Sequence, residues 1–181
     1  MRPDQAEFLL QFLLPQLNSE QAITKKIISS VPPGKDGYQP DPSSRTAFKR
    51  ALHISVVEMW FLDAVIHHHF GETIPRPAKM KTSLDAAQWY EETFRHRMPA
   101  LEKLSGEDLT TPVDFIGRRN DPAIAYLNIA IHPSVHHRGQ LSAYLRSMGA
   151  KVPAIYVESA DQPYPAEPSA ARESHQPPPA F

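Results

Sequence analysis

Residues 121–149, DPAIAYLNIAIHPSVHHRGQLSAYLRSMG, carry the start and stop signals of one long helix, and the fold can be worked out from this stretch. Asp121 offers a capping carboxylate, and Pro122 lacks only a backbone N–H that has no partner at the first helical position. Gly149 favours the left-handed conformation in which many helices end. We therefore predict a helix that begins at the Asp121–Pro122 pair and runs to Met148.

Apolar residues spaced three and four apart predict three further helices, over about residues 5–30, 44–70 and 83–101. The connection 31–44 contains four prolines and two glycines, so we expect a long irregular loop there. Residues 110–120 have turn residues and no helical period, which predicts a loop or a short extended piece. No segment alternates with a period of two residues. The pattern predicts an all-α protein, a four-helix bundle.

The length of 181 residues predicts a single domain. We place the bundle domain in residues 1–158 and expect a flexible tail over 159–181, because that segment contains six prolines and little apolar surface. A net charge of −1 argues against nucleic acid as a partner, and no apolar run is long enough to span a membrane. The N-terminus lacks the pattern of a signal peptide, so we expect a cytoplasmic protein.

The absence of cysteine excludes disulfides, thiolate zinc sites and a cysteine nucleophile, so histidine is the candidate for site chemistry. Three of the nine histidines are consecutive, His67 to His69. Neighbours on a helix point about 100° apart, so these three cannot converge on one ion. We interpret this run as a solvated helix end. His96 stands between two arginines and is expected on the surface.

Two other histidine groups favour a metal site. His53 lies between Leu52 and Ile54 on an expected inward face, where a lone histidine is ordinarily a hydrogen-bonded core residue. His132 and His136 are four residues apart, so a regular helix places them on one face as a chelating pair. With His53 as a third nitrogen, they would form an open three-ligand site suited to zinc or nickel.

Three stretches resemble a known family: LHISVVEMWFLDAVI at 52–66, PVDF at 112–115 and HHRGQLSAYLRSMGAKVPAIY at 136–156. They are similar to the DinB and YfiT-like metalloenzymes, whose name records induction by DNA damage. The resemblance covers about residues 5–160. It implies an up-down-down-up four-helix bundle, often a homodimer, in which three histidines bind a divalent ion, commonly zinc or nickel.

The same resemblance assigns ligands one by one. One ligand of the family matches His53, and a second matches His137, directly before the Arg-Gly-Gln motif. The third position, four residues before His137, is Pro133 here. Proline cannot bind a metal, but an interior proline unwinds or bulges a helix, which would turn the neighbouring His132 towards the site. Three outcomes stay open: a remodelled triad of His53, His137 and His132, a shifted pair of His132 and His136, or a site without metal.

For function, the resemblance extends to thiol-dependent transferases and isomerases, in which a metal converts a low-molecular-weight thiol into its thiolate. The expectation is therefore a metal-dependent transferase or hydrolase, with Arg138 or Arg119 as an anion clamp. Arg138 has a structural alternative as an interhelical ion-pair partner. Glu58 is either an acceptor that orients an imidazole or a surface charge. The rival hypothesis is a metal-free dimeric scaffold or a small-ligand-binding stress protein.

Overall fold

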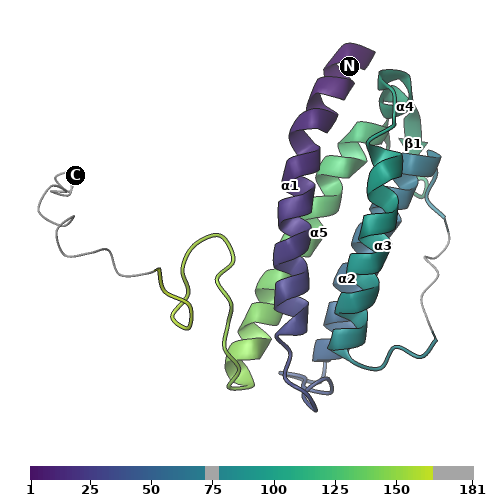
Figure 1. The fold of residues 1–181 in the computed structure, drawn as a ribbon. Coiled ribbons are helices and arrows are strands. Elements are labelled where there is room, and N and C mark those ends of the chain that lie inside the picture. The colour runs from purple at the N-terminus through teal and green to yellow at the C-terminus, as the bar shows by residue number, and fades with distance from the viewer. Residues whose placement is uncertain (72–77, 165–181) are drawn as a thin grey trace, which may run out of the picture.

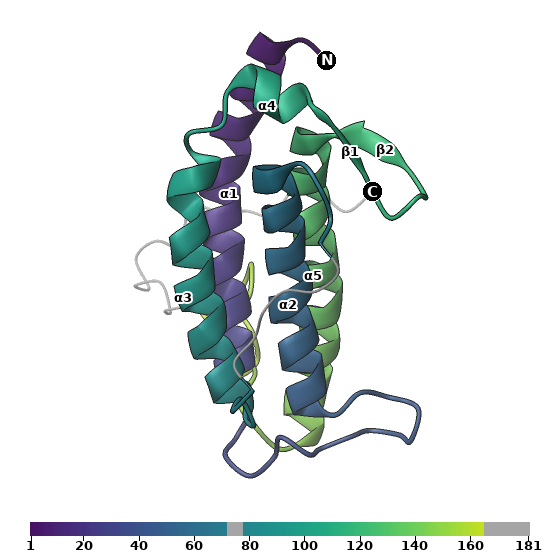
Figure 2. The same ribbon diagram turned by 90° about the vertical axis from the view of Figure 1, so that its right-hand side faces the viewer.

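The computed structural model describes residues 1–71 and 78–164, and it is built around four long helices (Figure 1). These are α1 (Pro3–Ser29), α2 (Ala47–His67), α3 (Ser83–Leu101) and α5 (Ala123–Ser147). Helix α1 packs against α3 and α5, and α2 packs against the same two helices. Helices α2 and α3 run in the same direction, opposite to α1 and α5, as Figure 2 also shows. The predicted up-down-down-up four-helix bundle is confirmed.

The helix ends agree with the expected spans to within a few residues. Helix α3 is capped by Thr82: the Thr82 hydroxyl accepts from the Asp85 N–H at 3.1 Å, and the Asp85 carboxylate accepts from the Thr82 N–H. Helix α5 has no side-chain cap, so the prediction that Asp121 caps it is wrong. Asp121 instead lies in a strand and pairs with Arg119. Gly149 has a φ of 72°, as expected for a helix terminator.

Between α3 and α5 the chain forms a short helix, α4 (Gly106–Thr110), and an antiparallel hairpin of β1 (Pro112–Asp114) and β2 (Asn120–Pro122). The hairpin agrees with the short extended piece expected over 110–120, whereas α4 was not predicted. Helix α4 approaches α1 closely: a Cβ atom on Gly106 would lie 2.5 Å from the carbonyl oxygen of Pro3. Only glycine fits this contact.

The apolar core has two parts, one towards α4 and the hairpin and one towards the loop that joins α1 to α2. In α1, α2 and α5, buried polar residues separate the residues of one core part from those of the other along the helix. We call this group the polar belt; its members are Glu20, Thr24, Ser55, Glu58, Ser134 and Arg138.

After α5, residues 150–164 return to the bundle. Arg146 forms an ion pair with Asp161 at 2.7 Å, and Lys26 donates to the side chain of Gln162 at 2.9 Å. The first residues of the expected flexible tail thus contact α1 and α5, while residues 165–181 lie outside the described part. Among the helices that the structure describes, none combines the length and the apolar character needed to cross a bilayer.

Candidate functional site

Helix α5 continues through Pro133 without interruption, so the expected bulge at this proline does not form. A proline removes one hydrogen bond of the helix, but Ile131 and Ser134 on either side are buried and hold the backbone in place. His132 is therefore not turned inward and is exposed.

His53 of α2 and His137 of α5 come together at the interface of their helices. Their Nε2 atoms are 3.1 Å apart, and the ring centroids are 4.7 Å apart with the planes at 67°. Both side chains are half-buried. We call these two residues the imidazole pair.

Two further side chains contact the imidazole pair through Nδ1 of His137. Arg50 Nη1 lies 2.9 Å from it, and Gln140 Oε1 lies 2.8 Å from it. A guanidinium group can only donate, whereas an amide can present either its oxygen or its nitrogen after a flip. Nδ1 has one in-plane lone pair, so it accepts fully from only one donor. With Arg50 as that donor, the Gln140 amide is reversed and shares the same lone pair, the hydrogen of His137 sits on Nε2, and this hydrogen is donated to Nε2 of His53.

The electrostatic environment of the imidazole pair is basic. Burial, followed by the charges of Arg45, His137 and Arg50, lowers the pKa of His53 from 6.5 to about 4. Burial also lowers the pKa of His137; the hydrogen bond with Gln140 opposes this shift, and the charges of Arg50, His136 and Arg45 add to it. Both imidazoles are therefore neutral near pH 7.

The other residues named from the sequence lie elsewhere. His136 is exposed, with its ring next to His137, and no hydrogen bond or ring contact joins His132 to the imidazole pair. Arg119 is exposed and bound to Asp121. Within residues 1–71 and 78–164, no group of three or more His, Cys, Asp or Glu side chains is arranged to hold a metal ion.

The donor set does not fit the three-ligand metal centre that the resemblance implied. Two nitrogens on one zinc ion lie roughly 3.3 Å apart, so the separation within the pair alone is compatible with a metal. The third position, however, is Pro133, and the guanidinium of Arg50 stands beside His137. When Nδ1 accepts from Arg50, Nε2 of His137 carries a hydrogen that a metal ion would have to displace.

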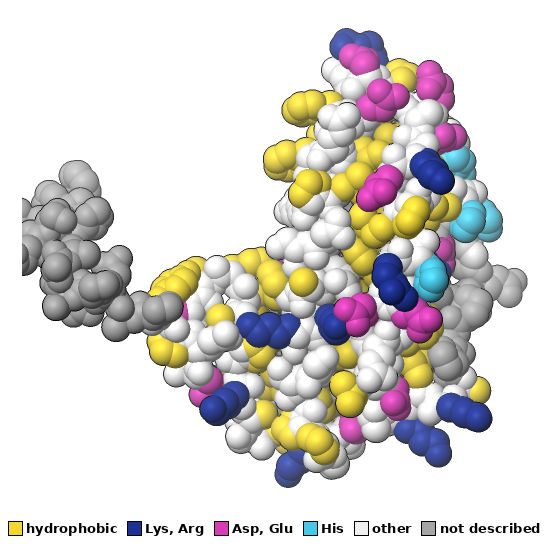
Figure 3. Space-filling view, viewed as in Figure 1, with side chains coloured by type: hydrophobic (Ala, Val, Ile, Leu, Met, Phe, Trp, Pro, Cys, Tyr) yellow, Lys and Arg dark blue, Asp and Glu magenta, His cyan; other side chains and the backbone are white. Residues whose placement is uncertain are grey.

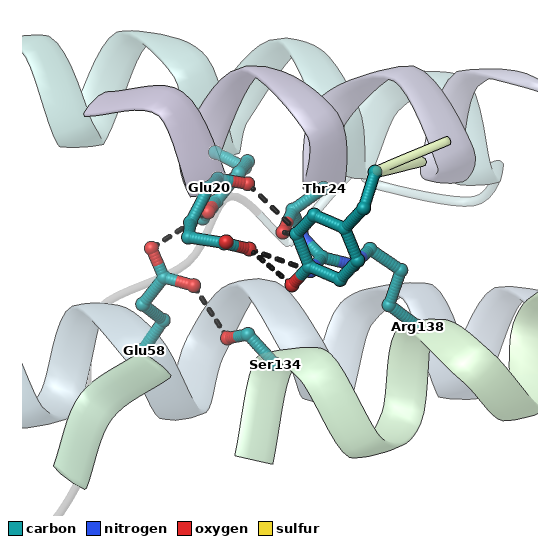
Figure 4. Close-up of polar contacts among 7 residues, drawn as sticks. Glu20, Thr24, Glu58, Ser134 and Arg138 are labelled. Atoms are coloured by element: carbon teal, nitrogen blue, oxygen red, sulfur yellow. Dashed lines mark hydrogen bonds and ion pairs between the residues drawn. The ribbon is translucent and has the colours of Figure 1, made fainter. Parts of the chain in front are cut away.

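The polar belt is the second cluster of polar side chains, and its members are bonded within the bundle (Figure 4). Glu58 accepts from Tyr90 at 2.7 Å and from Ser134, so it neither orients an imidazole nor lies on the surface. Arg138 binds Glu20 at 2.5 Å and Thr24 at 3.0 Å, and Tyr156 joins the same carboxylate at 3.0 Å. Arg138 is thus the interhelical ion-pair partner that we weighed as an alternative to an anion clamp.

The fold and the imidazole pair together define a four-helix bundle that presents histidines from two facing helices. The sequence profile of the DinB family matches residues 8–169, and the chain belongs to this family. Among solved structures, it is similar to a DinB-like protein of Bacillus subtilis, with a TM-score of 0.66 and 20% identity over 79% of this chain and 96% of that one. A DinB-like protein of Bacillus cereus gives 0.65 and 26% identity over 80% and 95%. No curated protein matches the chain significantly.

Sequence reasoning missed Arg50 and Gln140. Each lies three residues from a histidine of the imidazole pair on the same helix, Arg50 before His53 and Gln140 after His137. Residues three apart share a helix face, so this spacing was the available signal.

Proposed function

We propose that this DinB-family protein binds a small molecule at the imidazole pair and carries no resident zinc or nickel ion there. The observation that supports the proposal most directly is the bond between Arg50 and Nδ1 of His137 at 2.9 Å. Arg50 occupies Nδ1, the nitrogen whose hydrogen bond orients a metal-binding imidazole, and it places a positive charge against the same ring that a cation would have to bind.

The imidazole pair suits a ligand because its rings are half-buried and able to donate and accept hydrogen bonds. The polar belt lacks this property, since Glu58 is already bound by Tyr90 and Ser134, and Glu20 is paired with Arg138. A thiol-dependent transferase or hydrolase would need a metal to form the thiolate, and Pro133 removes a ligand for that metal. Ligand binding without metal chemistry is therefore the function that the geometry supports best.

The test is the metal content of the untagged protein, purified without added metal. We expect zinc and nickel far below one ion per chain. Near-stoichiometric metal that disappears in His53→Ala would overturn the proposal. Measuring His132→Ala and His136→Ala in parallel identifies the arrangement, because the remodelled triad depends on His132 alone of these two exposed residues and the shifted pair depends on both.

A further inference from the structure

Two arginines are buried among the residues that the structure describes, and they differ in whether a carboxylate pairs with them. Arg138, 1% exposed, is neutralised by Glu20 and further bound by Thr24 and Tyr156. Arg50, 7% exposed, has no carboxylate within ion-pair distance among the described residues. Its Nε atom is buried with no hydrogen-bond partner, and its one bond runs to His137.

A buried charge without a counter-ion is costly, so buried charges in proteins are ordinarily paired. Within residues 1–71 and 78–164, no carboxylate forms an ion pair with Arg50. Arg45, His136 and the imidazole pair are the charged or titratable groups that act on His53 and His137, and all of them are basic. The site therefore carries positive charge that no described residue neutralises, and a negatively charged ligand would supply the missing partner.

Hydrogen bonding points to the same kind of ligand. When Nδ1 of His137 accepts from Arg50, Nε2 of His137 donates to Nε2 of His53, and Nδ1 of His53 then carries a hydrogen that can be donated to a ligand. A ligand placed here meets donors and positive charge. Carboxylate and phosphate oxygens are acceptors that carry the matching negative charge.

We infer that Arg50, Arg45 and the imidazole pair form a binding site for the oxyanion group of a small molecule, a carboxylate or a phosphate. This inference rests on the proposed function and names the chemical class of its ligand. Arg50 supplies the fixed charge from inside the bundle, and the exposed Arg45 supplies a second charge from the α1–α2 connection. The half-buried imidazoles provide the surface that the ligand reaches.

The test is an NMR titration of the full chain that follows the imidazole resonances. Inorganic phosphate and acetate are added in separate experiments at constant pH, with sodium chloride replaced so that the ionic strength does not change. We expect saturable shifts of the His53 and His137 rings with one or both anions, and the stronger of the two distinguishes phosphate from carboxylate. Arg50→Gln and Arg45→Gln each weaken binding, Arg50→Gln by about tenfold. Arg95→Gln, at an exposed arginine of α3, is the matched control and leaves binding unchanged.

The inference is overturned if neither anion shifts the two rings, or if the Arg45 and Arg50 variants bind as the wild type does. If Arg50→Gln does not fold, Arg50→Lys replaces it as the variant that keeps the charge. Weaker anion binding by Arg45→Gln then supports the site, and unchanged binding by Arg45→Gln overturns it. A protein with near-stoichiometric metal refutes the proposed function. A metal-free protein whose imidazole resonances do not shift with either anion refutes only the oxyanion site.

Discussion

At the scale of single residues, Glu58 is the most perturbed carboxyl group that the structure describes. It is fully enclosed between α2, α3 and α5, where Tyr90 and Ser134 bind its two oxygens. Burial raises the pKa of Glu58 from 4.5 to about 7, although the hydrogen bonds and the charge of Arg138 act against the rise. A proton therefore binds this carboxyl more tightly in the folded protein than in the unfolded chain.

This difference predicts a pH-dependent stability. The stabilising contribution of Glu58 is fully present below about pH 4.5 and is lost as the pH rises through about 7, by about 3 kcal/mol in total. Urea unfolding of the wild type and Glu58→Gln across this range should show that the wild type loses stability relative to the variant as the pH rises. The lowered pKa of His53 acts in the opposite direction in both proteins and cancels in the difference.

Glu102→Gln, at an exposed carboxyl just after α3, serves as the control and should follow the wild type. A constant difference between the wild type and Glu58→Gln at every pH would show that Glu58 does not bind a proton in this range.

The sequence identified both members of the imidazole pair, because the motif around His137 is specific and His53 stands on an apolar helix face. It did not identify Arg50, since a single charged residue near a helix start looks like a surface charge. It also allowed a turn of His132 towards the site that the packing of α5 prevents. Such contacts depend on the rotation of two helices against each other, which no local pattern encodes.

At the scale of the elements, the ion pair between Glu20 of α1 and Arg138 of α5 links two helices inside the bundle. Residues 150–164 add to this link, because the Tyr156 hydroxyl donates to the same Glu20 carboxylate at 3.0 Å. Removing one member of such a pair leaves the other charge buried, whereas removing both leaves none.

We therefore predict that Glu20→Leu lowers the free energy of unfolding by about 3 to 5 kcal/mol. Adding Arg138→Met to that variant should recover more than half of the loss. The measurement is a double-mutant cycle by urea denaturation. If the losses of the two single variants simply add, the pair does not interact and the assignment of Arg138 as a structural partner is wrong.

The helices were predictable because the spacing of apolar residues indicates which face of a helix is buried. All four long helices lie where that spacing occurs in the sequence. The cap of α5 was not predictable, because Asp121 lies in the hairpin instead. There it is the strand partner of Val113 and forms an ion pair with Arg119. Helix α4 has only five residues, too short to show a period, and its position depends on the approach of Gly106 to Pro3.

At the scale of the whole molecule, an apolar surface remains near the start of α1. Phe8 and Phe12 lie one turn apart and are 68% and 66% exposed. Figure 3 shows hydrophobic side chains projecting from the upper part of the molecule, over α1. The groove beside Phe12 continues onto α5 at Ile124 and Ala125. Exposed aromatic side chains of this size are typical of protein interfaces.

We predict that this surface joins two copies of the chain, the homodimer that the family resemblance implied. Sedimentation velocity should give a dimer for the wild type and a monomer for Phe12→Glu, because a charge at the centre of an apolar interface is costly. Leu84→Glu, at an exposed leucine of α3, controls for the loss of any surface hydrophobic residue and should remain dimeric. A wild type that sediments as a monomer at every concentration would contradict the prediction.

Pro133 stands where a third metal ligand would be needed, and the proposed absence of a resident metal follows mainly from this position. A zinc titration in the presence of a competing chelator, carried out on the wild type, Pro133→His and His53→Ala, tests this claim most directly. Position 133 is one turn before His137, so a histidine there shares its helix face. We predict that Pro133→His binds zinc about a hundredfold or more tightly than the wild type. Equal affinity in both proteins, lost in each when His53 is replaced by alanine, would contradict it and show that the native chain already completes a metal site.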